Sequence, residues 1–463
     1  MSRSLPLVVV IPGIGGSELA DDSGTIVYGA GLGPLARVGL DPSVLDPDNE
    51  LHPVGLIGPF SLICWQLITG YEGLLNGITK GLGLSPDRVV TASEKLVDPH
   101  ATVVAFPYDF RRSVEHIAND LNRFVRERAP QGRRVVLVAH SMGGLVAAWW
   151  WAFLSEGIDV AEIITLGTPY RGAAQALDVL MNGLKWHHLP APPALSATLR
   201  KWDSVFELLP HYQVLEGTAE IRYPHELPSD ITRIVDGFSN KARKAYRKNR
   251  RLQKALENKV EESGRNPFTA YYSEGHRTLG CASIHDQTNR LVVAKRNPRA
   301  MPKSWEGGDG TVPTFSAIPG VLEIDPSRWR RLRGKHQDLV EEQSVFQHVS
   351  EYARDCLPAA ARGARGHDVD AYLQLDLEDV VLAGTEAEVR IRVVDKAGSV
   401  LEGVEKVGGN VGGNRFRADR GDDGWWLAQL PALEEGVHSL MLSATGVPNV
   451  DRLMLKTRVG AAS

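Results

Sequence analysis

Short apolar runs alternate along the chain with longer stretches in which apolar residues recur at helical spacing. The runs at 7–11, 135–139 and 162–166 are dominated by Val, Ile and Leu, which is typical of strands buried on both faces of a sheet. The stretches 113–128 and 144–154 separate such runs and have the periodicity or apolar length of helices. Strands that alternate with helices predict an α/β fold with a mostly parallel sheet and helices on both faces.

The hydrophobic pattern changes outside this alternating region. The segments at about 45–95 and 174–302 do not continue the alternation, and we expect them to form cap or lid insertions over the sheet. Residues 357–369 contain few large apolar side chains and are predicted to be a linker. Short strands separated by glycine-rich turns follow, which predicts an all-β immunoglobulin-like sandwich at 370–463. The α/β domain is therefore expected to span 1–356.

The segment Ala139–Gly144 has the sequence AHSMGG and stands between an apolar strand and an apolar helix. This is the strand–turn–helix setting of the nucleophile elbow in an α/β-hydrolase fold, where a serine projects from a sharp turn. Ala139 stands where the usual motif has its first glycine. The helix N-terminus also favours negative charge that develops beside it. Ser141 is therefore the predicted nucleophile, rather than a serine that only caps the helix.

A serine nucleophile needs an imidazole base and a carboxylate that orients this base. In this fold the acid and then the histidine follow the serine in the sequence. Asp309, in the segment GGDGTVP, is the candidate acid, and a plain Asp–Gly turn is the alternative. His336 lies in a predicted loop and is the candidate base. The pattern places its rival, His348, inside a helix, and His140 is not assigned this role.

Acyl transfer also needs backbone N–H groups that bind an oxyanion. One donor is expected from Met142, directly after the nucleophile. The other is expected from the glycine-rich segment after the first strand, with Ile14 as the donor; a flexible glycine turn is the alternative. This assignment explains why the N-terminal apolar run is interpreted as a strand rather than as a signal peptide.

Composition narrows the classes of function. The chain has 463 residues with 52 Lys and Arg against 56 Asp and Glu, so its net charge is −4. A chain without an excess of basic residues is not expected to bind nucleic acid. Three dispersed cysteines argue against a disulfide framework and fit a reducing compartment, so we expect a cytoplasmic location. The pair His187–His188 has no second ligand pair at suitable spacing. We therefore expect neither a metal nor another cofactor.

Six segments, taken together and in order, resemble the lecithin:cholesterol acyltransferase family of α/β-hydrolases, which includes lysosomal phospholipase A2. The segments are Ile11–Ser17, Pro107–Arg111, Ala139–Gly144, Gly167–Pro169, Phe206–Pro210 and Gly308–Pro313. The resemblance covers about residues 5–356. It implies an acyl ester, typically a phospholipid, as acyl donor, and water or an alcohol as acceptor. It also implies catalytic and oxyanion residues at Ser141, Asp309, His336, Ile14 and Met142.

The chain departs from that family in three respects. No signal peptide is evident, Cys64 has no nearby partner for the lid disulfide of the family, and the C-terminal sandwich lies outside the family core. These departures concern the substrate more than the chemistry. A carboxylesterase for small soluble esters and a partner-regulated or non-catalytic interaction module therefore stay open as alternatives.

Three segments bear on partners. Residues 60–82 are rich in apolar side chains and predict either a lid that contacts lipid or an amphipathic helix packed on the sheet. The basic run from Lys241 to Lys254 predicts contact with phosphate headgroups at a membrane surface, or a solvated helix face. The C-terminal sandwich is a candidate docking module for a protein. The expected partners are thus a lipid or ester substrate, a membrane surface and a protein, but not nucleic acid.

Overall fold

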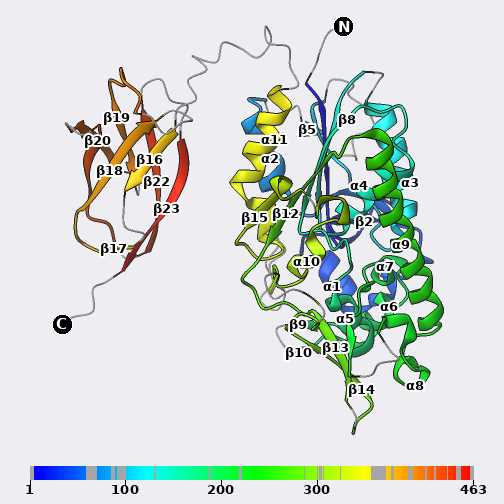
Figure 1. Ribbon diagram of the computed structural model, residues 1–463. Helices are drawn as coiled ribbons and strands as arrows, with labels where there is room; N and C mark the ends of the chain where they lie inside the picture. Colours follow the sequence, from blue (N-terminus) through cyan, green and yellow to red (C-terminus); the bar gives the residue numbers. More distant parts are fainter. Residues whose placement is uncertain are drawn as a thin grey trace. The chain divides into compact units, whose positions relative to one another are not determined.

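The computed structural model shows two compact units, Met1–Pro358 and Ala359–Ser463, each described here by itself (Figure 1). The expected linker at 357–369 and the predicted helix end at Cys356 lie outside the described residues. The structure describes residues 5–58, 70–84, 89–90, 101–129, 132–186, 189–217, 222–285, 287–299, 301, 305, 307–323, 325–355, 372–376, 380–394, 400–411, 414–421, 424–434, 436–444 and 450–458.

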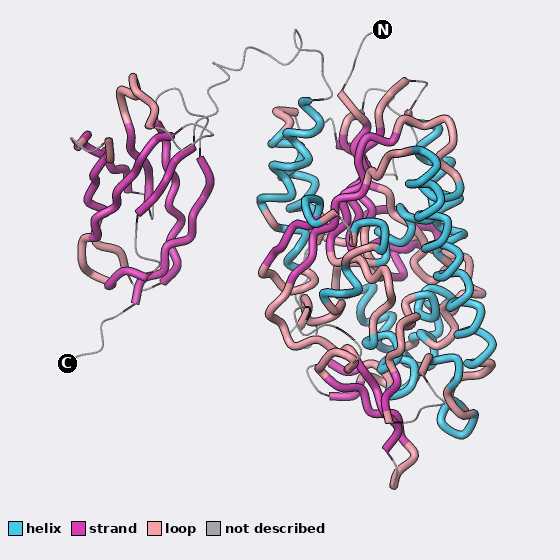
Figure 2. Tube along the Cα trace, in the orientation of Figure 1, coloured by secondary structure: helices cyan, strands magenta, loops and turns pink. Residues whose placement is uncertain are grey.

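The first unit is built around a seven-stranded sheet in the order β15-β12-β8-β7-β1-β6-β5 (Figures 1 and 2). Neighbouring strands in this sheet are parallel. Every residue of β1 and β7 is buried, as expected for a sheet that is covered on both faces. The strands are β1 (Leu7–Ile11), β5 (Val89–Val90), β6 (Val103–Ala105), β7 (Val135–His140), β8 (Val160–Leu166), β12 (Phe268–Ser273) and β15 (Trp329–Leu332).

The alternation of side chains along β1 assigns the helices to the two faces of the sheet. Its odd-numbered residues pack in a core cluster with apolar residues of α3 (Val114–Arg128), α4 (Met142–Phe153) and α9 (Phe238–Ser263). Its even-numbered residues pack with α2 (Glu72–Gly81) and α11 (Gln343–Asp355). Successive side chains of a strand point to opposite faces. Helices therefore cover both faces, and the expected α/β-hydrolase architecture is confirmed.

The expected cap at 174–302 needs a correction, because β12 lies within this range and belongs to the central sheet. Only the segments on either side of β12 form additional structure, including a three-stranded sheet in the order β11-β13-β14. The 3.6-residue periodicity of α9 and the short apolar run of β12 are local signals, but membership of the sheet is decided by packing. The elements around β12 are α5 (Ala174–Asn182), β9 (Lys185–Trp186), β10 (Leu189–Pro190), α6 (Pro193–Leu199), α7 (Asp203–Glu207), β11 (Leu215–Glu216), η3 (Pro224–Glu226), α8 (Ser229–Thr232), β13 (Cys281–His285) and β14 (Arg290–Ala294).

The expected insertion at 45–95 also belongs in part to the core. Helix α2 packs on one face of the sheet, and β5 extends the sheet at its edge. Of the predicted 60–82 segment, α2 is thus an amphipathic helix packed on the sheet, while 59–69 lie outside the described residues. The other elements of the first unit are β2 (Ser17–Ala20), β3 (Ile26–Tyr28), α1 (Leu32–Leu40), η1 (Pro42–Leu45), β4 (His52–Leu56), α10 (Thr314–Ala317), η5 (Gly320–Leu322), η6 (Pro326–Arg328) and η7 (Asp338–Glu341).

The second unit is all β, with strands in the order β16-β18-β21-β20-β19-β22-β23-β17. All neighbouring pairs are antiparallel except β17 with β23. Alternate residues of strands from both halves of this order share one apolar core, which agrees with the expected sandwich. The strands are β16 (Tyr372–Asp376), β17 (Val380–Leu382), β18 (Ala387–Val394), β19 (Val407–Val411), β20 (Asn414–Arg420), β21 (Trp426–Leu430), β22 (Gly436–Ala444) and β23 (Val450–Arg458).

Candidate active site

Ser141 occupies the turn between β7 and α4, as the sequence predicts. Its φ of 52° and ψ of −125° lie in a region that non-glycine residues rarely adopt. The turn is held because the Ser141 N–H donates to the Leu166 carbonyl at 2.8 Å and the Gly144 N–H donates to the Ser141 carbonyl at 3.0 Å. The strained turn presents the side chain at the carboxyl end of the parallel sheet, which is where ligands bind in open α/β sheets.

The structure brings the three predicted catalytic side chains into one hydrogen-bonded chain. His336 Nε2 lies 2.9 Å from Ser141 Oγ, and His336 Nδ1 lies 2.7 Å from Asp309 Oδ2. All three residues are buried, and Asp309 is only 2% exposed. A buried carboxylate on Nδ1 fixes the imidazole tautomer that leaves Nε2 free to accept the serine proton.

Backbone hydrogen bonds fix the positions of Asp309 and His336 relative to each other. Asp309 Oδ1 accepts hydrogen bonds from the N–H groups of Thr311 (2.9 Å) and Val312 (2.7 Å). The His336 N–H donates to the Asp309 carbonyl at 2.9 Å. Gly167 lies behind this pair with a φ of 56°, and a Cβ there would be 2.8 Å from Asp309 Oδ2. The Gly-Thr-Pro segment after β8 thus packs directly against the side chains of Asp309 and His336.

The loop after β1 lies close to Ser141, as the predicted role of Ile14 requires. A Cβ on Gly13 would be only 2.9 Å from Ser141 Cβ, so this position requires glycine. Met142 is the first residue of α4, and its N–H therefore has no acceptor within the helix. The predicted donors Ile14 and Met142 thus flank Ser141 from two separate elements.

Three tyrosine hydroxyls hold this loop in place. Tyr108 donates to the Pro12 carbonyl at 2.7 Å, and Tyr28 donates to the Gly15 carbonyl at 3.1 Å. Tyr71 accepts from the Gly13 N–H at 2.7 Å. Sequence reasoning missed these residues because each reaches the loop from another part of the chain, 13 to 96 positions away. Only the segment containing Tyr108 carried a signal, through its place in a family-like motif.

The cavity in front of Ser141 is predominantly apolar and has a volume of about 400 Å³, within the range of small-molecule sites. Among its described lining residues there is no Asp, Glu, Lys or Arg. An acyl chain would lose no hydrogen bonds on entering such a cavity, whereas a charged group would find no ionic partner there. Val38 of α1, Val179 of α5, Leu195 of α6 and Val205 of α7 supply apolar side chains, as does Trp202 directly before α7.

The alternative candidates take other roles. His348 contacts Tyr271 and Glu162, with Nε2 3.1 Å from Glu162 Oε1, and is therefore engaged away from Ser141. His187 and His188 lie outside the described residues. Within the described part of the chain, no group of three or more His, Cys, Asp or Glu side chains is arranged to hold a metal ion. Nor does any described helix combine the length and apolar character needed to cross a membrane.

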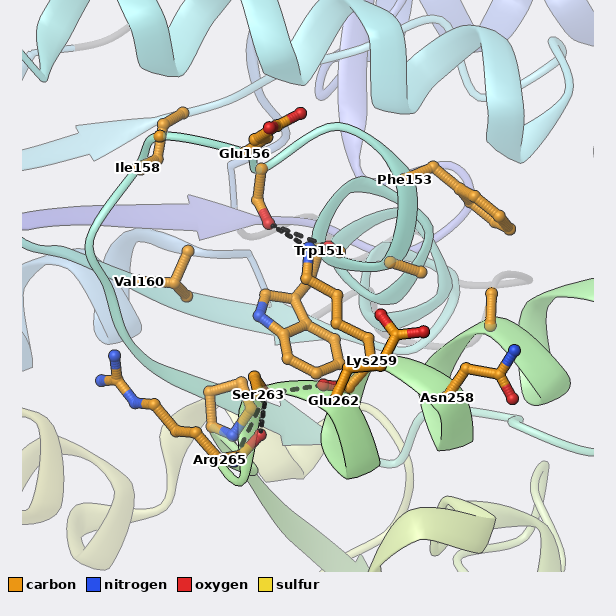
Figure 3. Close-up of a pocket in the computed structure, with 15 residues that line it drawn as sticks. Trp151, Phe153, Glu156, Ile158, Val160, Asn258, Lys259, Glu262, Ser263 and Arg265 are labelled. Carbon is orange, nitrogen blue, oxygen red and sulfur yellow. Dashed lines mark hydrogen bonds between the residues drawn. The ribbon is translucent and has the colours of Figure 1, made fainter.

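A second hollow, of about 580 Å³, lies between the end of α4 and the end of α9 and contains none of the catalytic residues (Figure 3). Its central polar group is the Lys259 ammonium, which donates to the Trp151 carbonyl and to Ser155 Oγ. A lysine that binds carbonyls at a helix C-terminus satisfies groups that the helix leaves unpaired. Lys259 thus anchors α9 to α4, and this hollow is a structural junction.

The basic run predicted between 241 and 254 lies on α9. Lys248 is engaged in ion pairs with Glu115 and Glu207, so it ties α9 to α3 and α7. The exposed cations are Arg243, Lys244, Arg247, Arg250, Arg251 and Lys254, and we call them the α9 cationic face. Within the described residues, no ion pair neutralises these six side chains. Arg251 packs on the Phe153 ring at 4.7 Å, which orders one guanidinium of this face.

Comparison with known proteins agrees with the resemblance seen in the sequence. The model of the lecithin:cholesterol acyltransferase family matches residues 94–272, so this resemblance is confirmed over that segment. The segment contains Ser141 but ends before Asp309 and His336. A search of curated proteins finds no match.

Several solved structures are similar to this chain at low identity. Bacillus licheniformis lipase BlEst2 in its propeptide form is 12% identical, with a TM-score of 0.32 over 92% of this chain and 68% of that one. Legionella pneumophila phospholipase PlaB in complex with thio-NAD is 9% identical, with a TM-score of 0.27 over 95% and 84%. The Escherichia coli adhesin FdeC is 18% identical, with a TM-score of 0.17 over 20% of this chain and 32% of the adhesin, so the chain spans about a third of that protein. These values support no assignment of a substrate.

Proposed function

We propose that this protein is a serine hydrolase or O-acyltransferase that acts on lipid esters, phospholipids included, through an acyl-enzyme. The observation that carries the proposal is the hydrogen-bonded chain from Ser141 through His336 to Asp309 at the mouth of an apolar cavity. The family match over 94–272 supports ester hydrolysis or acyl transfer as the general class of reaction.

The geometry suits a two-step mechanism. Ser141 Oγ attacks the ester carbonyl while His336 Nε2 accepts its proton, and Asp309 stabilises the imidazolium that forms. The Ile14 and Met142 N–H groups bind the tetrahedral oxyanion. His336 then gives its proton to the leaving alcohol, which leaves an acyl-enzyme. Water or an acceptor alcohol, deprotonated by His336, attacks this ester and releases the acyl group while the proton returns to Ser141.

The apolar cavity favours a long acyl chain over a short one. Each methylene that leaves water for an apolar site contributes about 0.8 kcal/mol, so the rate of acylation should rise with chain length until the cavity is full. A small-ester carboxylesterase, the first alternative, would show no such rise. We therefore propose lipid esters as the substrate class, with p-nitrophenyl esters of two to sixteen carbons as the discriminating series.

We further propose a membrane surface and a protein as partners, and a cytoplasmic location. The α9 cationic face supports peripheral contact with an anionic membrane surface. The separate C-terminal unit supports contact with a protein partner, and the dispersed cysteines support a cytoplasmic location.

The experiment that tests the proposed function is fluorophosphonate labelling followed by intact-mass measurement and peptide sequencing. We expect one adduct, on Ser141, and its loss in Ser141→Ala. In His336→Ala the labelling rate should fall by at least 100-fold, because the serine loses its base. Ser316→Ala, which removes a buried hydroxyl outside the cavity, is the matched control and should keep the adduct. A wild-type protein that neither labels nor hydrolyses any ester of the series would overturn the proposal and favour a non-catalytic interaction module.

A further inference from the structure

A second hydrogen-bonded chain runs beside the catalytic one and connects the loop after β1 to the loop that carries the base. The Gly13 N–H donates to Tyr71 Oη at 2.7 Å, and Tyr71 Oη lies 2.8 Å from His140 Nδ1. His140 Nε2 lies 2.9 Å from the backbone carbonyl of His336. Tyr71 and His140 are 4% and 7% exposed, so bulk water does not compete for these hydrogen bonds.

The direction of every hydrogen bond in this chain follows from chemistry. A backbone carbonyl only accepts, so His140 Nε2 carries the proton. Burial lowers the pKa of His140 to about 3, so the ring is neutral at physiological pH and Nδ1 is an acceptor. The Tyr71 O–H therefore donates to Nδ1, and its oxygen accepts from the Gly13 N–H. The His336 carbonyl and the Tyr71 hydroxyl thus favour the same neutral tautomer of His140.

We propose that Tyr71 and His140 are positioning residues for two parts of the site. They set the geometry of the loop after β1, which carries the proposed oxyanion donor Ile14 and is called the oxyanion loop below, together with that of the catalytic base His336. The inference rests on the proposed function, and it assigns a role to two residues that the triad does not include. Both residues line the cavity, but among the described hydrogen bonds none joins either side chain to Ser141 Oγ. Tyr71 fixes Gly13, next to the proposed donor Ile14, and His140 fixes the backbone of His336.

The charge state of His140 also bears on the reaction. The rings of His140 and His336 have centroids 4.8 Å apart. When His336 takes the serine proton it becomes an imidazolium, and a second positive ring at this distance would oppose that charge. A hydroxyl that donates to Nδ1 stabilises the neutral ring, because a protonated Nδ1 would face the Tyr71 hydrogen. These hydrogen bonds thereby keep the His140 ring neutral throughout the catalytic cycle.

The decisive experiment combines kinetics with nitrogen NMR of histidine-labelled protein. Tyr71→Phe keeps the ring and removes only the hydroxyl. Tyr28→Phe is the matched control, since it also removes a hydroxyl that holds the oxyanion loop but has no contact with His140. His140→Gln retains a donor towards the His336 carbonyl, and His140→Leu retains none. The substrate is a p-nitrophenyl ester of medium chain length, and thermal unfolding checks that each variant folds.

We expect wild-type His140 to show the Nε2–H tautomer and no titration between pH 5 and 9. In Tyr71→Phe the Nδ1 resonance of His140 should shift, because this nitrogen loses its hydrogen bond while the His336 carbonyl still holds the proton on Nε2, and kcat should fall about tenfold with little change in KM. Tyr28→Phe should leave the His140 signal unchanged whatever its effect on kcat. His140→Gln should retain several-fold more activity than His140→Leu.

Two results would overturn the inference. One is a wild-type His140 that carries its proton on Nδ1 or titrates near pH 6.5, which needs no variant to observe. The other is a folded Tyr71→Phe protein with wild-type kcat and an unchanged His140 signal. Because the NMR readout does not depend on turnover, it remains informative even if fluorophosphonate labelling shows that the proposed function is wrong.

Discussion

At the scale of single residues, the candidate site depends on glycines at which a Cβ atom would not fit. Gly13 lies against Ser141, and Gly167 lies against Asp309 and His336. At Gly167 two requirements coincide, since the backbone has a positive φ and a Cβ would approach both the acid and the base. Close packing therefore positions the catalytic side chains as much as their own hydrogen bonds do.

We predict that Gly167→Ala lowers kcat by about 100-fold, because displacing the acid and base by a fraction of an ångström breaks their alignment with Ser141. Gly157→Ala is the matched control: its φ is also positive, at 77°, but no atom lies within 4 Å of the added Cβ. Both variants should lose about 1–2 kcal/mol of stability from the left-handed backbone. Kinetics and thermal unfolding of the two variants separate strain from misalignment, and equal kcat values in both would contradict this explanation.

At the scale of elements, the parallel sheet gathers segments that are distant in the sequence at one edge. β1 leads into the oxyanion loop, β7 into Ser141, and β8 into Gly167. Helix α9 has a different role, since one side packs on α4 and α7 while the other presents the α9 cationic face to solvent. An exposed row of like charges on a long helix is the kind of surface that anionic lipids attract.

We predict that combining Arg243→Gln, Arg247→Gln and Arg251→Gln weakens binding to vesicles of phosphatidylserine and phosphatidylcholine by about 100-fold at low salt. The basis is about 1 kcal/mol for each cation near an anionic surface. Cosedimentation against lipid concentration measures this effect. The control combines Arg277→Gln, Arg290→Gln and Arg299→Gln, exposed arginines outside α9, and should change binding far less. Equal loss in both triples would indicate a response to net charge alone and no specific role for α9.

At the scale of the whole molecule, the chain consists of two units with separate apolar cores. All described residues of the catalytic chain and its cavity lie in the first unit. The described residues on which the proposed chemistry depends therefore all belong to the first unit.

We predict that a protein truncated after Pro358 keeps the fluorophosphonate adduct on Ser141 and at least half of the wild-type kcat on a soluble ester. The physical reason is that, among the described residues, none from the second unit belongs to the apolar clusters of the first. The measurement is kcat and labelling rate for the truncated and full-length chains. A folded truncated protein that fails to label would show that the C-terminal unit completes the active site.

The sequence by itself determined the features that local pattern encodes. Four features depend on signals within a few turns of chain: the apolar strands, the helical pattern around the basic run at 241–254, the all-β character of the C-terminal region, and the turn that carries Ser141. The choice of His336 over His348 also followed from local pattern, because one lies in a loop and the other on a helical stretch. The expected insertions at 45–95 and 174–302 were partly wrong, because membership of α2, β5 and β12 in the core is not a local property.

Only the tertiary structure decided how distant residues meet. Ser141 and His336 are 195 positions apart, and Tyr71 and His140 are 69 apart. The order of residues predicted that an acid and a base would reach Ser141. It contained no signal for Tyr71, which directly precedes α2 and meets His140 because α2 packs on the sheet. The apolar character of the cavity arises in the same way, from helices α1, α5, α6 and α7. Hydrogen bonds and cavities depend on which surfaces pack together, and packing is settled by the whole fold rather than by any one segment.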